Sequence, residues 1–181
     1  MIHLYTGNGK GKTTAAFGLA MRSVGHGGRV LVIQFMKSRI CGEHIAALRL
    51  EPELTVERMG PDVSDSVWTD STRARWVDAA EPLGDDIAAA GLARDRAKDA
   101  ILSGDYDMVV LDEIISAVSC GLLAEDDVIN LMRLVPAEVE LVLTGDPAPE
   151  PIRHMADLVT DMRSEKHYFD RGVAARKGIE F

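Results

Sequence analysis

The chain has 181 residues, of which 46% are hydrophobic and 27% are charged, as in a globular protein of one domain. Its formal net charge of −9 argues against nucleic acid as a partner, because phosphate-backbone binding needs a basic face. A small anionic ligand is still compatible with this charge, since it needs only a local positive pocket.

Two features that the sequence lacks bear on the state of its cysteines and on where the protein is expected to be found. The sequence has no CxxC pair, so Cys41 and Cys120 are more typical of free thiols than of a disulfide. It shows no signal peptide and no apolar run near the ~20 residues of a membrane span, so we expect a cytoplasmic protein without a membrane partner.

Short apolar segments alternate with helical patterns along the chain. In chain order we expect a strand at 2–5, a helix at 12–24, strands at 29–34 and 54–57, a helix at 85–102, a strand at 108–111, a helix at 124–134, a strand at 140–143, a helix at 149–155 and a strand at 158–160. The strands are apolar enough to be mostly buried on both faces, which indicates a parallel sheet covered by helices on both sides. The predicted fold is therefore a single α/β domain over residues 1–181, with irregular segments at 36–43, 60–84 and 164–181.

The strongest functional signal is the segment Thr6-Gly-Asn-Gly-Lys-Gly-Lys-Thr-Thr14, which follows a predicted strand and opens a predicted helix. Glycines let backbone N–H groups turn toward phosphate oxygens, and the start of a helix adds positive potential. We expect Lys12 on the phosphates, the Thr13 hydroxyl on Mg²⁺ and Lys10 as a second cation, in a P-loop NTPase-like (RecA-like), mostly parallel fold. The candidate nucleotide contacts in this loop are Gly7, Asn8, Gly9, Lys10, Gly11, Lys12, Thr13 and Thr14.

The loop departs from the usual P-loop spacing. Thr6 stands where glycine is usual, and the nearest glycine, Gly7, comes one residue late. The nucleotide is therefore not assumed to lie as it does in ordinary P-loop ATPases. The alternative, a glycine turn that binds nothing, is disfavoured by Gly-Lys-Thr-Thr at a strand-to-helix junction.

A second signal is the segment Met108-Val-Val-Leu-Asp-Glu113, an apolar strand that ends in two carboxylates. In P-loop proteins such a strand lies beside the first one and aims a carboxylate at the metal. Asp112 could instead cap the helix that follows. The pair also suits an ATPase, in which Glu113 would activate water.

Beyond the loop, several stretches resemble the ATP:corrinoid adenosyltransferases, the family that acts in cobalamin synthesis and salvage. They are Arg22-Ser-Val-Gly-His-Gly27, Gln34-Phe-Met-Lys37, Gly42-Glu43, Val109-Val-Leu-Asp-Glu113, Leu143-Thr-Gly145, Ala156-Asp-Leu-Val-Thr, Lys166-His167, Phe169-Asp170, Gly172 and Ala175-Arg-Lys-Gly-Ile-Glu-Phe181. The matches span nearly the whole chain in the family's order. The loop and the tail together are much more specific than the loop alone.

The resemblance implies an unusual use of the loop. In this family Co(I) of the corrin attacks the 5′ carbon of the ATP ribose and the whole triphosphate leaves, held in an orientation reversed from that in ordinary P-loop NTPases. The match implies Lys12 and Glu113 as catalytic residues, and Thr13 and Glu113 as ligands of Mg²⁺ (or Mn²⁺) with Asp112 nearby. Arg22 resembles the family's nucleotide-contacting arginine, although an ordinary solvated helix arginine is the alternative.

The family makes Co(I) from Co(II) within the site, helped by a Phe-Thr-Trp wedge that removes the lower axial ligand. This sequence lacks Phe-Thr-Trp, and a gapless count back from Asp112 points to Trp76 as its replacement, our third catalytic candidate. Trp68 is the second choice if the segment carries an insertion, and either tryptophan could simply pack against the core. Asp146, where the family often has arginine, and Ser38, where glycine is common, are further departures.

Three functions fit these observations. The leading one is transfer of the 5′-deoxyadenosyl group of ATP to a corrinoid, for which the resemblance also implies a flavoprotein reductant and a homodimer. The second is an ATPase or phosphotransferase with Glu113 as base, and the third is a non-catalytic module that binds ATP or an adenosylated corrinoid. The sequence leaves open which corrinoid is the natural substrate.

Overall fold

A six-stranded parallel sheet forms the centre of this computed structural model, which describes residues 1–37, 39–60 and 84–181. Its strands are β1 (Ile2–Thr6), β2 (Val30–Phe35), β3 (Leu54–Met59), β4 (Met108–Asp112), β5 (Glu140–Thr144) and β6 (Leu158–Asp161). They lie in the order β3-β2-β4-β5-β1-β6, and all neighbours pair in parallel. The predicted α/β class is confirmed, and each predicted strand is present within a residue or two of its expected bounds.

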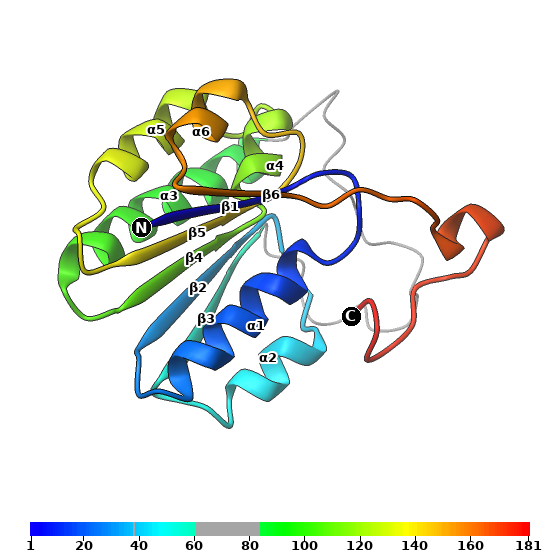
Figure 1. Cartoon of the computed structure of the whole chain (residues 1–181), viewed down its shortest axis with the longest axis horizontal. Helices are drawn as coiled ribbons and strands as arrows, with labels where there is room; N and C mark the ends of the chain where they lie inside the picture. Colours follow the sequence, from blue (N-terminus) through cyan, green and yellow to red (C-terminus); the bar gives the residue numbers. More distant parts are fainter. Residues whose placement is uncertain (38, 61–83) are drawn as a thin grey trace.

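Helices cover both faces of the sheet (Figure 1). One face carries α1 (Lys12–Val24) and α2 (Gly42–Ala47), and the other carries α3 (Gly84–Ser103), α4 (Ile114–Ser119), α5 (Glu125–Arg133) and α6 (Glu150–Met155). The sequence analysis does not predict α2 and α4, each six residues long, because α2 begins in a segment expected to be irregular and α4 follows the carboxylate strand directly. A short 3₁₀ turn, Tyr168–Arg171, interrupts the tail.

The alternation of side chains along each strand divides the core in two. Leu31 and Ile33 of β2 pack with residues of α3 to α6, whereas Val30 and Val32 pack with α1 and α2. This explains why the strands are apolar without alternation. Strand β6 is the exception to the predicted burial, because all four of its residues are exposed at the edge of the sheet.

Parallel strands bring their carboxyl ends to one edge, and that edge positions the site. Strand β5 lies between β1 and β4, so the expectation that the loop strand and the carboxylate strand are neighbours is wrong. Helix α1 bridges the gap, since it packs across both β4 and β5. The start of α1 can therefore reach the end of β4.

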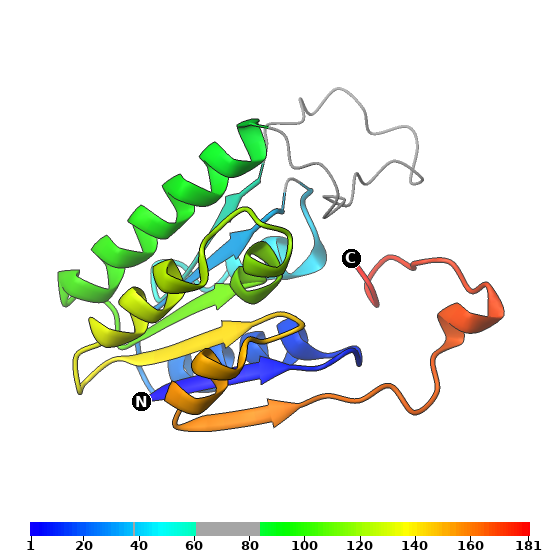
Figure 2. The ribbon, with the colours of Figure 1, turned by 90° about the horizontal axis from the view of Figure 1, so that it is seen from above.

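Beyond β6, residues 162–181 leave the sheet at the same edge and extend past the loop that joins β1 to α1 (Figures 1 and 2). None of the described helices combines the length and apolar character that crossing a membrane requires. Neither Cys41 nor Cys120 takes part in a disulfide within the described part of the chain, as predicted. Trp68, Trp76 and Ser38 lie outside the described residues.

Candidate functional site

The loop between β1 and α1 is shaped by close contact with the tail. Gly7 has a φ of 97°, and a Cβ atom there would lie only 2.3 Å from the Met162 carbonyl oxygen. At Gly9 a Cβ would lie 2.7 Å from the same oxygen, which accepts a hydrogen bond from the Gly9 N–H at 2.7 Å. The N–H of Gly7 donates to Asp146 Oδ1 at 2.9 Å. Two amides expected to face phosphate thus face protein acceptors instead.

The cation of Lys12 is held against the curve of the loop. Its Nζ donates to the carbonyl oxygens of Gly7 at 2.6 Å and of Gly9 at 3.0 Å. Helix α1 begins directly after Gly11 without a side-chain cap and without an acidic residue in its first turn. Its first N–H groups have no intrahelical partners, and they carry the positive end of the helix dipole. These features fit a bound phosphate group.

A buried carboxylate lies at the end of β4. Asp112 is fully buried, and its Oδ1 accepts hydrogen bonds from the Thr13 hydroxyl at 2.9 Å and from the Thr144 hydroxyl at 2.7 Å. Its Oδ2 accepts from Gln34 Nε2 at 2.9 Å. The structure thus brings together Thr13 and Asp112, as predicted. The hydrogen bonds described for Asp112 go to side chains and not to the start of α4, which is where a helix cap would bond. Hydroxyl and carboxylate oxygens are ligands that Mg²⁺ prefers.

The neighbouring carboxylate, Glu113, sits in an unusual backbone conformation. Its φ of 63° is left-handed, which costs roughly 1–3 kcal/mol in a residue other than glycine. Its N–H donates to Thr144 Oγ1 at 2.8 Å, and its Oε2 accepts from the Ser116 hydroxyl. Burial raises the pKa of Glu113, while the Ser116 hydrogen bond and the nearby Lys12 charge partly offset this rise. A divalent cation would favour the charged form, so this carboxylate fits a metal site.

Asp146 links the loop to the carboxylate pair. Its Oδ1 accepts from the Thr6 hydroxyl at 3.2 Å and from the Gly7 N–H. Its own N–H donates to Ser116 Oγ at 3.3 Å, and Ser116 in turn donates to Glu113. A continuous set of hydrogen bonds therefore connects the first turn of the loop with Glu113.

A second cation stands at the end of β2. Lys37 forms an ion pair with Glu43 of α2 at 2.8 Å. Burial alone would lower the pKa of Lys37, but the hydrogen bond and charge of Glu43 raise it overall. Lys37 is close enough to Glu113 for its charge to lower the pKa of that carboxyl group. The charges of Lys12 and Lys37 thus both act on the carboxylate pair at the end of β4.

Two predicted loop residues contact the tail. Asn8 Oδ1 accepts the N–H of Ser164 at 3.1 Å, and Lys10 Nζ donates to the Ile179 carbonyl oxygen at 3.2 Å. The tail folds back on itself where Tyr168 and Arg176 both bond to the Glu180 carboxylate. The loop and the C-terminal end of the chain are therefore joined directly.

The remaining predicted residues lie apart from this cluster. Thr14 is exposed in the first turn of α1, and Arg22 is exposed in its last turn, about 15 Å from Lys12 along the helix axis at 1.5 Å per residue. The nucleotide contact of Arg22 stays a prediction. Sequence reasoning missed Gln34, Thr144 and Ser116. Polar residues at the ends of apolar strands are the signal that points to the first two, whereas nothing in the pattern singles out Ser116.

The parallel sheet, the loop at its carboxyl edge and the carboxylate pair at the end of β4 define an α/β protein with a P-loop-like fold. Over residues 1–181 the chain matches the family model of the ATP:corrinoid adenosyltransferase BtuR/CobO/CobP, and it belongs to this family of transferases. It is 36% identical over 182 residues to a corrinoid adenosyltransferase of Pseudomonas aeruginosa, covering 100% of this chain and 83% of that one. It is also 36% identical over 185 residues to those of Escherichia coli and Salmonella typhimurium, covering 100% of this chain and 85% of each.

Proposed function

We propose that this chain transfers the 5′-deoxyadenosyl group of ATP to the cobalt of a reduced corrinoid and releases inorganic triphosphate. The observation that carries the proposal is the meeting of the Lys12 cation, the Thr13 hydroxyl and two carboxylates at one edge of the sheet, in a chain that matches the family throughout. In the reaction, the electron pair of Co(I) forms the bond to C5′. The bond from C5′ to oxygen breaks, and its electron pair leaves with the triphosphate.

In this proposal the loop binds the leaving group. Lys12 would exchange its bonds to the Gly7 and Gly9 carbonyls for phosphate oxygens, which is a short movement of one flexible side chain. The open N–H groups at the start of α1 would add further donors. Donors fixed in place before the reaction stabilise charge that develops on the leaving oxygen at little reorganisation cost.

We assign the metal to Thr13 and Glu113, with Asp112 as the residue that positions Thr13 through their 2.9 Å hydrogen bond. Mg²⁺, when bound there, would neutralise part of the triphosphate charge. Gln34 and Thr144 hold Asp112 from the two neighbouring strands, so its orientation is fixed before any ligand arrives. Mn²⁺, which takes similar oxygen ligands, is an alternative ion.

Our candidates for a role in the reduction of Co(II) lie outside the described part of the chain. We propose Trp76 as the aromatic wedge, with Trp68 as the alternative. Trp76→Ala should spare the adenosylation of Co(I) that is generated chemically, and should impair the route from Co(II) with a mild protein reductant such as a flavoprotein. Equal losses in both assays would mean that Trp76 only packs the segment, and a selective loss for Trp68→Ala would move the role there.

We further propose that the protein works as a cytoplasmic homodimer, an expectation drawn from the resemblance. Sedimentation analysis of the purified chain tests the dimer. The exposed edge strand β6, with Leu158 and Val159 in contact with solvent, is one surface that association could cover.

The proposed reaction is tested by mixing the protein with MgATP and chemically reduced cobalamin and following the corrin absorbance. The spectrum should change to that of an alkylated corrinoid, and Lys12→Ala should abolish the change. Production of ADP and phosphate without a new cobalt–carbon bond would show an ATPase or phosphotransferase instead. Binding of ATP without any product would show a binding module.

A further inference from the structure

Three side chains of the kinds that bind metal ions meet at the start of α2. The Cys41 sulfur, a carboxylate oxygen of Glu43 and a ring nitrogen of His44 all lie within 4.8 Å of one another. Ligand atoms around one Zn²⁺ ion, each roughly 2.0–2.3 Å from it, are about 3–4 Å apart. Small side-chain rotations would therefore bring the three groups onto a single ion.

The start of the helix is what brings these groups together. Cys41 is the N-cap residue of α2, and Glu43 and His44 lie in its first turn. His44 Nδ1 accepts the N–H of Cys41 at 2.8 Å, as Glu or Gln does in a capping box, where Ser or Thr is the usual N-cap. Helix capping thus accounts for the positions of Cys41 and His44 but not for the choice of a thiol and an imidazole. Of the three residues, Glu43 alone lies in a stretch that resembles the family.

Few contacts hold the thiol and the imidazole in their present positions. Cys41 is 7% exposed, and the hydrogen bond described for its sulfur, to the Arg39 carbonyl oxygen, is long at 3.9 Å. His44 Nε2 is buried without a hydrogen-bond partner in the described part of the chain. Because Nδ1 accepts the Cys41 N–H, the proton of the neutral ring lies on Nε2. The Nδ1 lone pair can therefore turn from that N–H to an ion without a change of tautomer.

Glu43 connects this group with the candidate site at the end of β4. Its carboxylate pairs with Lys37 at 2.8 Å. Lys37 in turn interacts electrostatically with Asp112 and Glu113. An ion bound to Glu43 would compete with Lys37 for the carboxylate and would leave the lysine cation to the carboxylate pair.

We propose that Cys41, Glu43 and His44 form a binding site for Zn²⁺, with water as the fourth ligand. Thiolate, imidazole and carboxylate are the groups that bind zinc in proteins, and a tetrahedral ion with three protein ligands keeps one open position. The thiol of Cys41 releases its proton to solvent when the ion binds, because the ligand is the thiolate.

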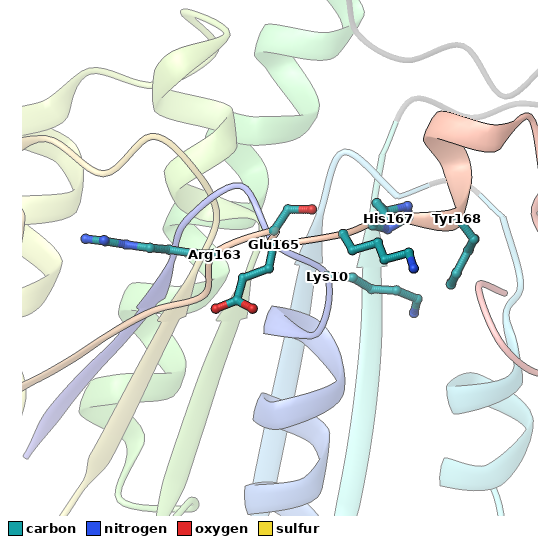
Figure 3. A pocket seen from close by; sticks show the side chains of 7 residues that line it. Lys10, Arg163, Glu165, His167 and Tyr168 are labelled. Carbon is teal, nitrogen blue, oxygen red and sulfur yellow. The ribbon is translucent and has the colours of Figure 1, made fainter.

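This zinc site is separate from the features described above. Mg²⁺ prefers oxygen ligands, such as those of Thr13 and Glu113. None of the three zinc ligands lines the cavity beside the phosphate loop, whose walls include Lys10 and Tyr168 (Figure 3). The proposed adenosyl transfer assigns no role to these ligands, so the inference does not depend on it.

The test measures metal binding to the full chain after treatment with a chelator, in excess Mg²⁺ to fill the oxygen site. Calorimetry should show one equivalent of Zn²⁺ bound, and the bound ion should raise the thermal unfolding midpoint. Co²⁺ serves as the spectroscopic probe, since a thiolate bound to it produces a charge-transfer absorption band. Co²⁺ should produce that band, and Zn²⁺ should remove it by competition.

The variants are chosen to keep the start of α2 intact. Cys41→Ser and His44→Gln retain capping-box residues, so the unfolding midpoint of the metal-free protein should not change. Each should weaken zinc binding by about tenfold or more, and Cys41→Ser should abolish the thiolate band. Cys120→Ser is the matched control and should change neither measurement. Lys37→Met should tighten zinc binding about two- to fivefold, the usual range for a partly exposed ion pair, because it releases Glu43.

Three results would overturn the inference. Failure of the wild type to bind Zn²⁺ would leave these residues as a helix cap and nothing more. Zinc binding that Cys41→Ser leaves unchanged, without a thiolate band, would place the ion on oxygen ligands elsewhere. A thiolate band that persists in Cys41→Ser and disappears in Cys120→Ser would assign the ion to Cys120.

Discussion

The two halves of the candidate site are built in opposite ways. At the ends of β2, β4 and β5, the side chains of Gln34, Asp112 and Thr144 are fully buried and bonded to one another. On the tail, residues 163–166 are exposed, and few hydrogen bonds hold them to the loop. Buried polar networks are costly to disrupt, whereas exposed ion pairs contribute little to stability. Changes in the first half should therefore affect both folding and activity, and changes in the second half should affect binding alone.

The largest expected effect comes from the residue that stands between the two halves. Lys12→Ala should weaken ATP binding about ten- to a hundredfold, the range for one charge-assisted phosphate contact, and abolish transfer. Stability should change little, because the hydrogen bonds described for Lys12 go to two loop carbonyls. Calorimetric titration with ATP measures the effect, and Lys98→Ala is the charge control. An unchanged ATP affinity would contradict the assignment of the loop.

The next prediction separates the two carboxylates. Asp112→Asn should lower the free energy of unfolding by about 1–3 kcal/mol, because an amide nitrogen would face the hydroxyl or amide donors that now bond to the carboxylate. Glu113→Gln should lower the rate and the Mg²⁺ dependence more than Asp112→Asn does. Denaturant titration measures the stability of the two variants, and initial rates at saturating Mg²⁺ measure their activity. A larger loss of rate for Asp112→Asn would reverse the metal assignment.

The third prediction concerns how the stability of Glu113→Gln, relative to the wild type, depends on pH. Because burial raises the pKa of Glu113 above its ordinary value of 4.5, the folded state keeps that proton to higher pH than the unfolded state does. Stability from this group is thus present at low pH and is lost as pH rises through the raised pKa. Without metal, the variant should be more stable than the wild type at neutral pH, by about 0.5–2 kcal/mol as is common for stabilising changes, and equal to it near pH 4. Thermal unfolding in EDTA at both pH values tests this, and lower stability at neutral pH would show that Glu113 is stabilising.

The smallest effect is expected on the tail. Glu180→Gln should leave the unfolding midpoint unchanged while speeding amide exchange at Arg176, whose N–H donates to Glu180 at 2.6 Å. In the wild type, hydrogen bonds from Arg176 and Tyr168 hold the pKa of Glu180 at about 2. Protection of Arg176 should therefore persist in mild acid and disappear only as pH falls toward 2. Exchange measured by NMR decides this, and a lowered midpoint would show that the tail contributes to global stability.

The sequence predicts local features of this molecule better than contacts between distant segments. Apolar runs predicted the strands, and the loop motif predicted that Thr13 and Asp112 meet. The position of β5 between β1 and β4 could not be read from any one segment, because strand order depends on how whole helices pack. The docking of Met162 against Gly7 and Gly9 was equally hidden, since it joins residues more than 150 positions apart in the chain. Gln34 and Thr144 could have been found, because a polar residue that ends a buried strand must bond to a neighbour.

The central claim is that this protein transfers the 5′-deoxyadenosyl group of ATP, through its C5′ carbon, and does not transfer the γ-phosphate. The most direct measurement uses ATP labelled with ¹³C at C5′ together with a chemically reduced corrinoid. We predict that the label moves to a cobalt-bound carbon while inorganic triphosphate appears in equal amount. Label that stays in ADP or AMP while phosphate or pyrophosphate is released would contradict the account.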